Sequence, residues 1–151
     1  MTTRKTRVKA RKTSQGDAVI DNTLFSCLIH LEIADFLPLV FKHIKIPPQV
    51  WEEAARSPGK MKKRLTKKIA EMKGFFVDCY DADEMMVNFL KASLDSGESA
   101  AIAQADYLRI PVLIDEDKGT KVATKMSIEV IRTGRVLVML KEAGALKEVR
   151  P

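Results

Sequence analysis

Residues 95–115 read DSGESAAIAQADYLRIPVLID, and this stretch decides the fold class because it joins a helix to a buried strand. Asp95-Ser96-Gly97 precedes an Ala-rich segment that predicts a helix over 98–108. Residues 111–114 are a short apolar run that predicts a buried strand, and Asp115 follows it directly. A strand without polar alternation is typical of a parallel sheet that is covered on both faces.

The same alternation of short apolar runs and helical segments continues along the whole chain. Further strands are expected at 18–20, 44–46, 75–79 and 129–131. Further helices are expected at 24–31, 35–41, 48–55, 61–72, 84–92, 118–126 and 135–142. Strands that alternate with helices predict an α/β fold in which helices cover both faces of a central, mainly parallel sheet.

Length and composition exclude several classes of protein. The chain has 151 residues, which suits one domain, and 46% of them are hydrophobic, which is too many for a chain disordered throughout. The most apolar long stretch, 24–41, contains His30, Glu32 and Asp35, so we expect no transmembrane helix. Two cysteines cannot form a disulfide framework, and no apolar signal segment follows the basic N-terminus. We therefore expect a cytoplasmic protein.

The positive charge of the chain lies mainly at its N-terminus. The net charge is +6, and residues 1–16 contain six Lys and Arg residues and no acid. We expect 1–16 to be a basic, disordered tail and 17–151 to be a single domain. A second basic run lies on the expected helix 61–72, where Lys62 and Lys63 are candidates for binding nucleic-acid phosphates. A solvated surface helix would show the same pattern.

Acidic residues follow or flank the expected strands. Asp21 follows the first strand, Asp115 follows the strand 111–114, Glu52 and Glu53 lie on the helix after the second strand, and Glu98 begins the Ala-rich helix. Singly, each acid has an ordinary explanation as a helix cap or a solvated turn residue. Together they indicate one cluster, because ligands bind at the carboxyl ends of parallel strands. Such a cluster needs a cation, and carboxylate oxygens suit Mg²⁺ or Mn²⁺.

Four segments resemble those of PIN domains, and in particular the short prokaryotic PIN proteins related to VapC-type toxins. These segments are 19–23 (VIDNT), 46–53 (IPPQVWEE), 94–103 (LDSGESAAIA) and 112–119 (VLIDEDKG). The resemblance covers about 18–150. It implies a three-layer α/β/α sandwich and a metal-dependent ribonuclease that uses Mg²⁺ or Mn²⁺ and leaves a 3′-hydroxyl and a 5′-phosphate.

The resemblance also implies roles for individual residues. The catalytic acids would be Asp21, Glu53, Glu98 and Asp115, and the metal ligands would be Asp21, Glu98, Asp115 and Asp117. Thr23 matches a small hydroxyl residue that would orient a carboxylate or bind a phosphate. Arg132 and Arg135 stand where such proteins usually have glycines, and they would bind RNA or obstruct the site.

Two other functions are compatible with the sequence. The leading hypothesis is an endoribonuclease that is the toxin of a toxin–antitoxin pair, forms a homodimer and binds a small antitoxin protein. The first alternative is a catalytically silent PIN domain that binds nucleic acid or a protein, and the arginines at 132 and 135 motivate it. The second is a structural subunit that docks through the helix 61–72.

Overall fold

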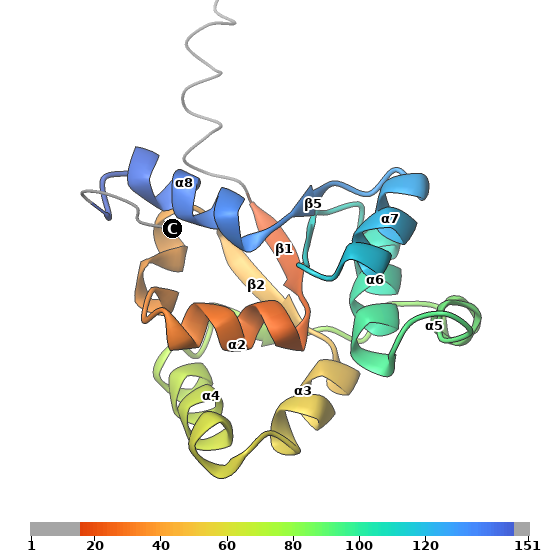
Figure 1. Ribbon diagram of the computed structural model, residues 1–151, viewed down its shortest axis with the longest axis horizontal. Coiled ribbons are helices and arrows are strands. Elements are labelled where there is room, and N and C mark those ends of the chain that lie inside the picture. The colour runs from red at the N-terminus through yellow and green to blue at the C-terminus, as the bar shows by residue number, and fades with distance from the viewer. Residues whose placement is uncertain (1–15, 147–151) are drawn as a thin grey trace, which may run out of the picture.

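The computed structural model describes residues 16–146, and over this range the chain forms a five-stranded parallel sheet between two groups of helices (Figure 1). The strands run in the order β3-β2-β1-β4-β5, and their bounds are β1 Asp17–Ile20, β2 His43–Ile46, β3 Phe76–Asp78, β4 Val112–Leu113 and β5 Val130–Ile131. The predicted α/β/α fold is confirmed. Of the predicted basic tail 1–16, residues 1–15 lie outside the described range.

The central strand β1 divides the hydrophobic core into two parts. Ala18, Val19 and Ile20 are all fully buried. Ala18 and Ile20 belong to one apolar cluster and Val19 to the other, because successive side chains of a strand point to opposite faces of the sheet. Both faces of β1 are therefore dry, which explains why the sequence of this strand shows no polar alternation.

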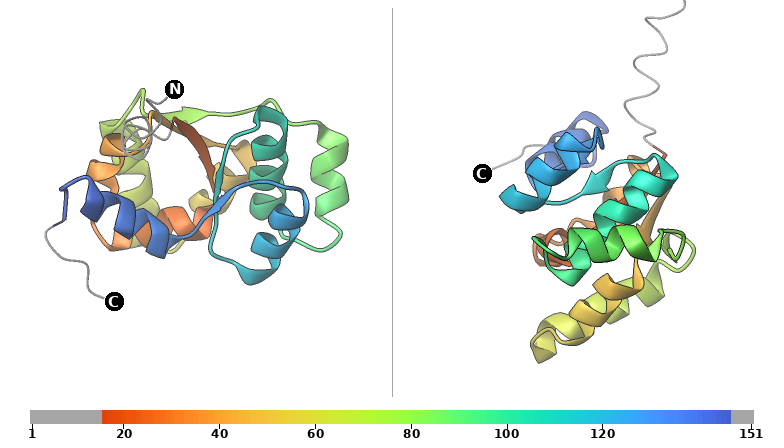
Figure 2. Two further views of the ribbon diagram at one scale, coloured as in Figure 1. Left: turned by 90° about the horizontal axis from the view of Figure 1, so that it is seen from above. Right: turned by 90° about the vertical axis from the view of Figure 1, so that its right-hand side faces the viewer.

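Helices cover the two faces unequally. One cluster contains residues of α2 (Asn22–His30), η1 (Ala34–Leu39), α3 (Pro48–Ala55), α4 (Gly59–Glu71) and α8 (Thr133–Glu142). The other contains residues of α5 (Glu84–Leu90), α6 (Ser96–Leu108) and α7 (Asp117–Lys125). Seen from above, the two groups lie on opposite sides of the sheet (Figure 2).

The element bounds lie within two residues of the predicted ones, and two of the differences involve proline. The predicted helix 35–41 is a 3₁₀ segment, Ala34–Leu39, with Pro38 inside it. Proline has no N–H for an α-helical hydrogen bond, which favours the short i→i+3 form here. The predicted strand 111–114 is reduced to Val112–Leu113 because Pro111 has no N–H to donate to a neighbouring strand.

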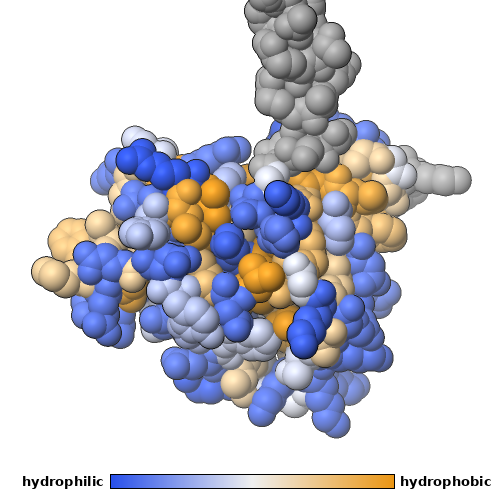
Figure 3. All heavy atoms as spheres, turned by 180° about the vertical axis from the view of Figure 1, so that it is seen from behind, coloured by the Kyte–Doolittle hydropathy of each residue, from blue (hydrophilic) through white to orange (hydrophobic). Residues whose placement is uncertain are grey.

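The described surface is mostly polar, and none of the described helices is long and apolar enough to cross a membrane. Apolar side chains nevertheless reach the surface at the edge that carries α5, where Met85 is 77% exposed and Phe89 75%. The view from behind shows hydrophobic patches separated by hydrophilic side chains (Figure 3).

Candidate metal centre

The site begins with Asp21, the residue directly after the central strand β1. Its backbone N–H donates to the carbonyl oxygen of Leu113 on β4 at 3.1 Å, so its position is set by the sheet. Its Oδ2 accepts a hydrogen bond from the backbone N–H of Thr23 at 3.3 Å, and Asp21 thereby caps α2. Asp21 is only 1% exposed, although it carries an ionisable group.

Two further carboxylates meet Asp21 from different helices. Oxygen atoms of Asp21, Glu53 and Asp95 lie within 4.8 Å of one another, and we call these three residues the acidic triad. Glu53 is on α3 and Asp95 is the N-cap of α6, where its Oδ1 accepts from the N–H of Glu98 at 2.8 Å. Three segments that are distant in sequence thus converge at the carboxyl edge of the sheet.

A glycine makes room for the Glu53 carboxylate. The backbone N–H of Gly97 donates to Glu53 Oε2 at 2.8 Å. A Cβ atom at Gly97 would lie only 2.7 Å from Glu53 Cδ, which is closer than real Cβ atoms approach. The glycine of the 94–103 segment therefore permits the close approach of α3 and α6 that brings Glu53 to Asp95.

Glu98 adds a fourth carboxylate beside the triad. The residue is 6% exposed, and its Oε2 is buried without a hydrogen-bond partner among residues 16–146. A Cβ at Gly119, in the first turn of α7, would lie 3.3 Å from this oxygen, so the α7 backbone also approaches closely. A buried carboxylate oxygen without a donor is costly, and a bound cation would remove that cost.

Burial and mutual repulsion change the proton affinity of these acids. Burial and, second to it, the nearby charges of Asp95 and Glu98 together raise the pKa of Asp21 from 3.8 to about 7. Burial and then the Asp95 charge likewise raise the pKa of Glu53 and that of Glu98. The site therefore favours the binding of a proton or a metal cation. Its carboxylate oxygens are hard donors, which suit a divalent ion such as Mg²⁺ or Mn²⁺.

Asp115 and Asp117 lie beside the acidic triad and are not members of it. Asp115 is two residues past Leu113, whose carbonyl binds the Asp21 backbone. Thr133 at the start of α8 holds both Asp115 oxygens: its N–H donates to Oδ1 at 2.9 Å and its hydroxyl to Oδ2 at 2.5 Å. Arg132 contacts Asp115 and Asp117 from the same turn.

The structure separates the predicted nucleic-acid contacts into two groups. The backbone of Thr23 binds Asp21, and its side chain is exposed next to the site. Arg132 and Arg135 are both exposed at the start of α8. Lys62 and Lys63 are exposed on α4 and, with Gly59, Thr66 and Lys67, line an open hollow of about 480 Å³. The two lysines lie on a different helix from the acids.

Asp95 is the member of the triad that we did not predict as a site residue. Glu53 was predicted as a catalytic acid and not as a metal ligand, whereas Asp95, which directly precedes a helix, was given no role. Its position three residues before Glu98 was a usable signal, because an N-cap aspartate lies at the same helix end as a side chain of the first turn.

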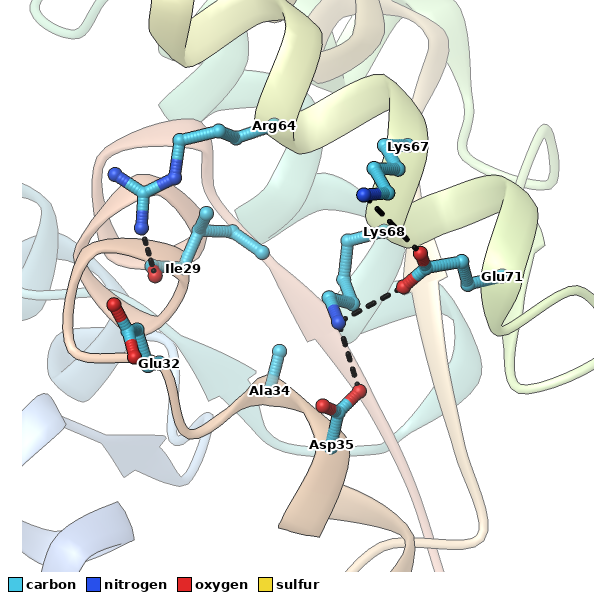
Figure 4. A pocket seen from close by; sticks show the side chains of 8 residues that line it. All are labelled: Ile29, Glu32, Ala34, Asp35, Arg64, Lys67, Lys68 and Glu71. Carbon is cyan, nitrogen blue, oxygen red and sulfur yellow. Dashed lines mark hydrogen bonds and ion pairs between the residues drawn. The ribbon is translucent and has the colours of Figure 1, made fainter.

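A separate cavity of about 340 Å³ lies between α4 and the turn after α2, away from these acids (Figure 4). Its positive groups are already paired. Lys68 Nζ lies 2.9 Å from Asp35 Oδ1 and 3.0 Å from Glu71 Oε1, and Arg64 donates to the Ile29 carbonyl at 2.8 Å. Because its charges are balanced internally, we assign this cavity a structural role in joining α4 to the body.

A family model described as a PIN domain matches residues 17–151. A comparison with curated proteins gives no significant match.

Proposed function

Because the chain belongs to the PIN domain family, a nuclease fold, we propose that it is a divalent-metal-dependent endoribonuclease that hydrolyses RNA phosphodiesters. The observation that carries this proposal is the acidic triad of Asp21, Glu53 and Asp95, whose oxygens lie within 4.8 Å of one another. Asp21 is buried, Glu53 is half-buried and Asp95 is exposed. Grouping three negative charges around a buried carboxylate opposes folding unless a cation neutralises them.

The residues present fit a divalent ion. The donors are carboxylate oxygens, and Glu98 Oε2 is buried beside them without a partner. We propose that Asp21, Glu53, Asp95 and Glu98 hold the ion. Asp115 is a further acid at the same edge of the sheet, and we call this edge the acidic edge. When bound, Mg²⁺ or Mn²⁺ supplies Lewis-acid chemistry, namely neutralisation of phosphate charge and acidification of water.

The surrounding residues position the acids and the substrate. Gly97 orients Glu53 through its N–H, and Thr133 fixes Asp115 through two hydrogen bonds. The exposed Thr23 lies in the first turn of α2, where backbone N–H groups favour a phosphate. We propose that Arg135, together with Lys62 and Lys63 on α4, contacts the RNA backbone further from the site.

The biological role and the partners belong to the same proposal. The VapC-like motifs support a toxin that forms a homodimer and is inhibited by a small antitoxin protein. For the homodimer, we propose the exposed face of α5 as the contact between two copies, because Met85 and Phe89 are four residues apart on one helix and largely exposed.

One observation favours the second candidate, a catalytically silent PIN domain that binds nucleic acid or protein. The guanidinium of Arg132 lies 3.1 Å from Asp117 Oδ1 and 3.8 Å from Asp115 Oδ1. A cation that is part of the chain thus neutralises some of the acids that the resemblance assigns to the metal site.

RNA cleavage tests the proposal. Purified full-length protein should cleave structured RNA with Mn²⁺ or Mg²⁺ and lose this activity in EDTA. Asp21→Asn and Glu53→Gln should each abolish cleavage, whereas Glu52→Gln should retain it, because Glu52 is an exposed neighbour on the same helix. Cleavage by Asp21→Asn at the wild-type rate would refute the proposal, and metal-independent RNA binding without cleavage would establish the silent module.

A further inference from the structure

Arg132 is a positively charged side chain that pairs with two acids at the acidic edge. Its Nη2 lies 3.1 Å from Asp117 Oδ1, and its Nε lies 3.8 Å from Asp115 Oδ1. The same Nη2 also donates to the backbone carbonyl of Asp115. One guanidinium therefore spans Asp115, in the β4–α7 connection, and Asp117, the first residue of α7. We call Asp115 and Asp117 the outer acid pair.

The acidic triad and the outer acid pair differ in their charge balance. In residues 16–146, neither Asp21, Glu53 nor Asp95 forms an ion pair with a lysine or arginine. The outer acid pair, in contrast, is bridged by Arg132 and anchored by Thr133. The two groups are neighbours, because the backbone of Asp21 binds Leu113 two residues before Asp115.

We propose that Arg132 takes the place of a second metal ion at this site, so that the protein binds one divalent ion per chain, at the acidic triad. This inference rests on the proposed metal-dependent function. It also assigns Arg132 a role different from RNA binding: it positions and neutralises Asp115 and Asp117.

The chemistry of the guanidinium explains why it would exclude an ion. Arginine keeps its positive charge throughout the working pH range, and its planar fork binds two oxygen acceptors at once. A divalent ion at the outer acid pair would meet this fixed charge at close range and would have to displace its hydrogen bonds. The triad is free of that competition, and its unpartnered neighbour Glu98 Oε2 still lacks a donor.

Counting bound Mn²⁺ tests the inference without using activity. Full-length protein is titrated with Mn²⁺, and free Mn²⁺ is measured by electron paramagnetic resonance. We expect one ion in the wild type and in Arg132→Lys, which keeps the charge, and two ions in Arg132→Gln. Arg135→Gln is the matched control: it removes the same charge from the same helix at an exposed position, and it should bind one ion.

A further variant locates the second ion. Adding Asp117→Asn to Arg132→Gln should return the count from two ions to one. Two ions in the wild type, or one in both the wild type and Arg132→Gln, would overturn the inference and leave the proposed nuclease function standing. No bound Mn²⁺ in any variant would overturn the metal site itself, and with it both proposals.

Discussion

Replacing Asp21 by asparagine should stabilise the metal-free protein above pH 7, although it removes an acid that we place in the active site. Burial, followed by the charges of Asp95 and Glu98, raises the pKa of Asp21 from 3.8 to about 7. The carboxyl group therefore loses its proton more readily in the unfolded chain than in the folded one. Asparagine has a similar shape and carries no charge to bury.

The pKa values set both the size and the direction of the effect. A rise from 3.8 to about 7 corresponds to about 4 kcal/mol, at about 1.36 kcal/mol per pH unit. Between these pH values the folded state binds more protons than the unfolded state, so the free energy of unfolding falls as pH rises. The loss from Asp21 begins near pH 4 and is complete above about pH 7. Domains are stable by only about 5–15 kcal/mol, so the effect is measurable.

Urea unfolding in EDTA, followed by circular dichroism from about pH 4 to pH 8, measures this difference. Asp21→Asn should match the wild type near pH 4 and exceed it by up to about 4 kcal/mol near pH 8. Adding Mn²⁺ at about 100 times its Kd should stabilise the wild type by about 2.7 kcal/mol and the variant by less. A variant equally or less stable than the wild type at both pH values would refute the reasoning, because Asp21 would then carry no repulsive charge.

Three further substitutions test the packing and contacts around the site. Gly97→Ala should weaken Mn²⁺ binding about tenfold, because the added Cβ displaces Glu53. Gly134→Ala is the control, since Gly134 is also the second residue of a helix but has open space around it, and titration calorimetry should give the wild-type Mn²⁺ affinity. Thr133→Val should lower cleavage about tenfold by releasing Asp115, and Thr133→Ser should restore it; equal rates for all three proteins would contradict this role. Changing Lys62 and Lys63 together to alanine should reduce the salt dependence of single-stranded RNA binding by about 1.4 in log–log slope, while Lys141→Ala, an exposed lysine on α8, should not.

The sequence was sufficient to predict the order of the elements, because the central strands β1 and β4 are buried on both faces and appear as short apolar runs. Val112 and Leu113, for example, are fully buried and lie between a proline and an acid. The expected positions of the acids at strand ends and helix starts also predicted that Asp21, Glu53, Glu98 and Asp115 meet at one edge, since parallel strands end together. The structure groups Asp21 and Glu53 with Asp95, with Glu98 near Asp21, whereas Asp115 is outside this group. Helix ends were less predictable: the start of α6 at Ser96 depends on the capping hydrogen bond that the backbone N–H of Glu98 donates to Asp95 Oδ1.

Two features of the site depend on tertiary contacts that no local pattern reports. Asp95 joins the triad only because Gly97 lets α3 approach α6, and the requirement for glycine comes from the Glu53 carboxylate, 44 residues away. The pairing of Arg132 with Asp115 and Asp117 likewise depends on how α8 follows β5. In the sequence, Arg132 is one of two unusual arginines, and nothing local distinguishes it from Arg135.

The two halves of the acidic edge balance their charge in different ways, and this difference links stability to function. At the outer acid pair, Arg132 supplies one positive charge within the chain, which offsets one of the two carboxylate charges whether or not a metal ion is bound. At the triad, burial and then repulsion raise the pKa of Asp21 and Glu53. The ionised carboxylates therefore destabilise the folded protein until a cation binds to them. Replacing Arg132 by glutamine would remove the positive charge from the outer acid pair, so that repulsion between Asp115 and Asp117 would also destabilise the metal-free protein. The variant should therefore gain more stability from Mn²⁺ than the wild type does, and a thermal melt with and without Mn²⁺ that showed equal gains would place Arg132 outside the charge balance of the site.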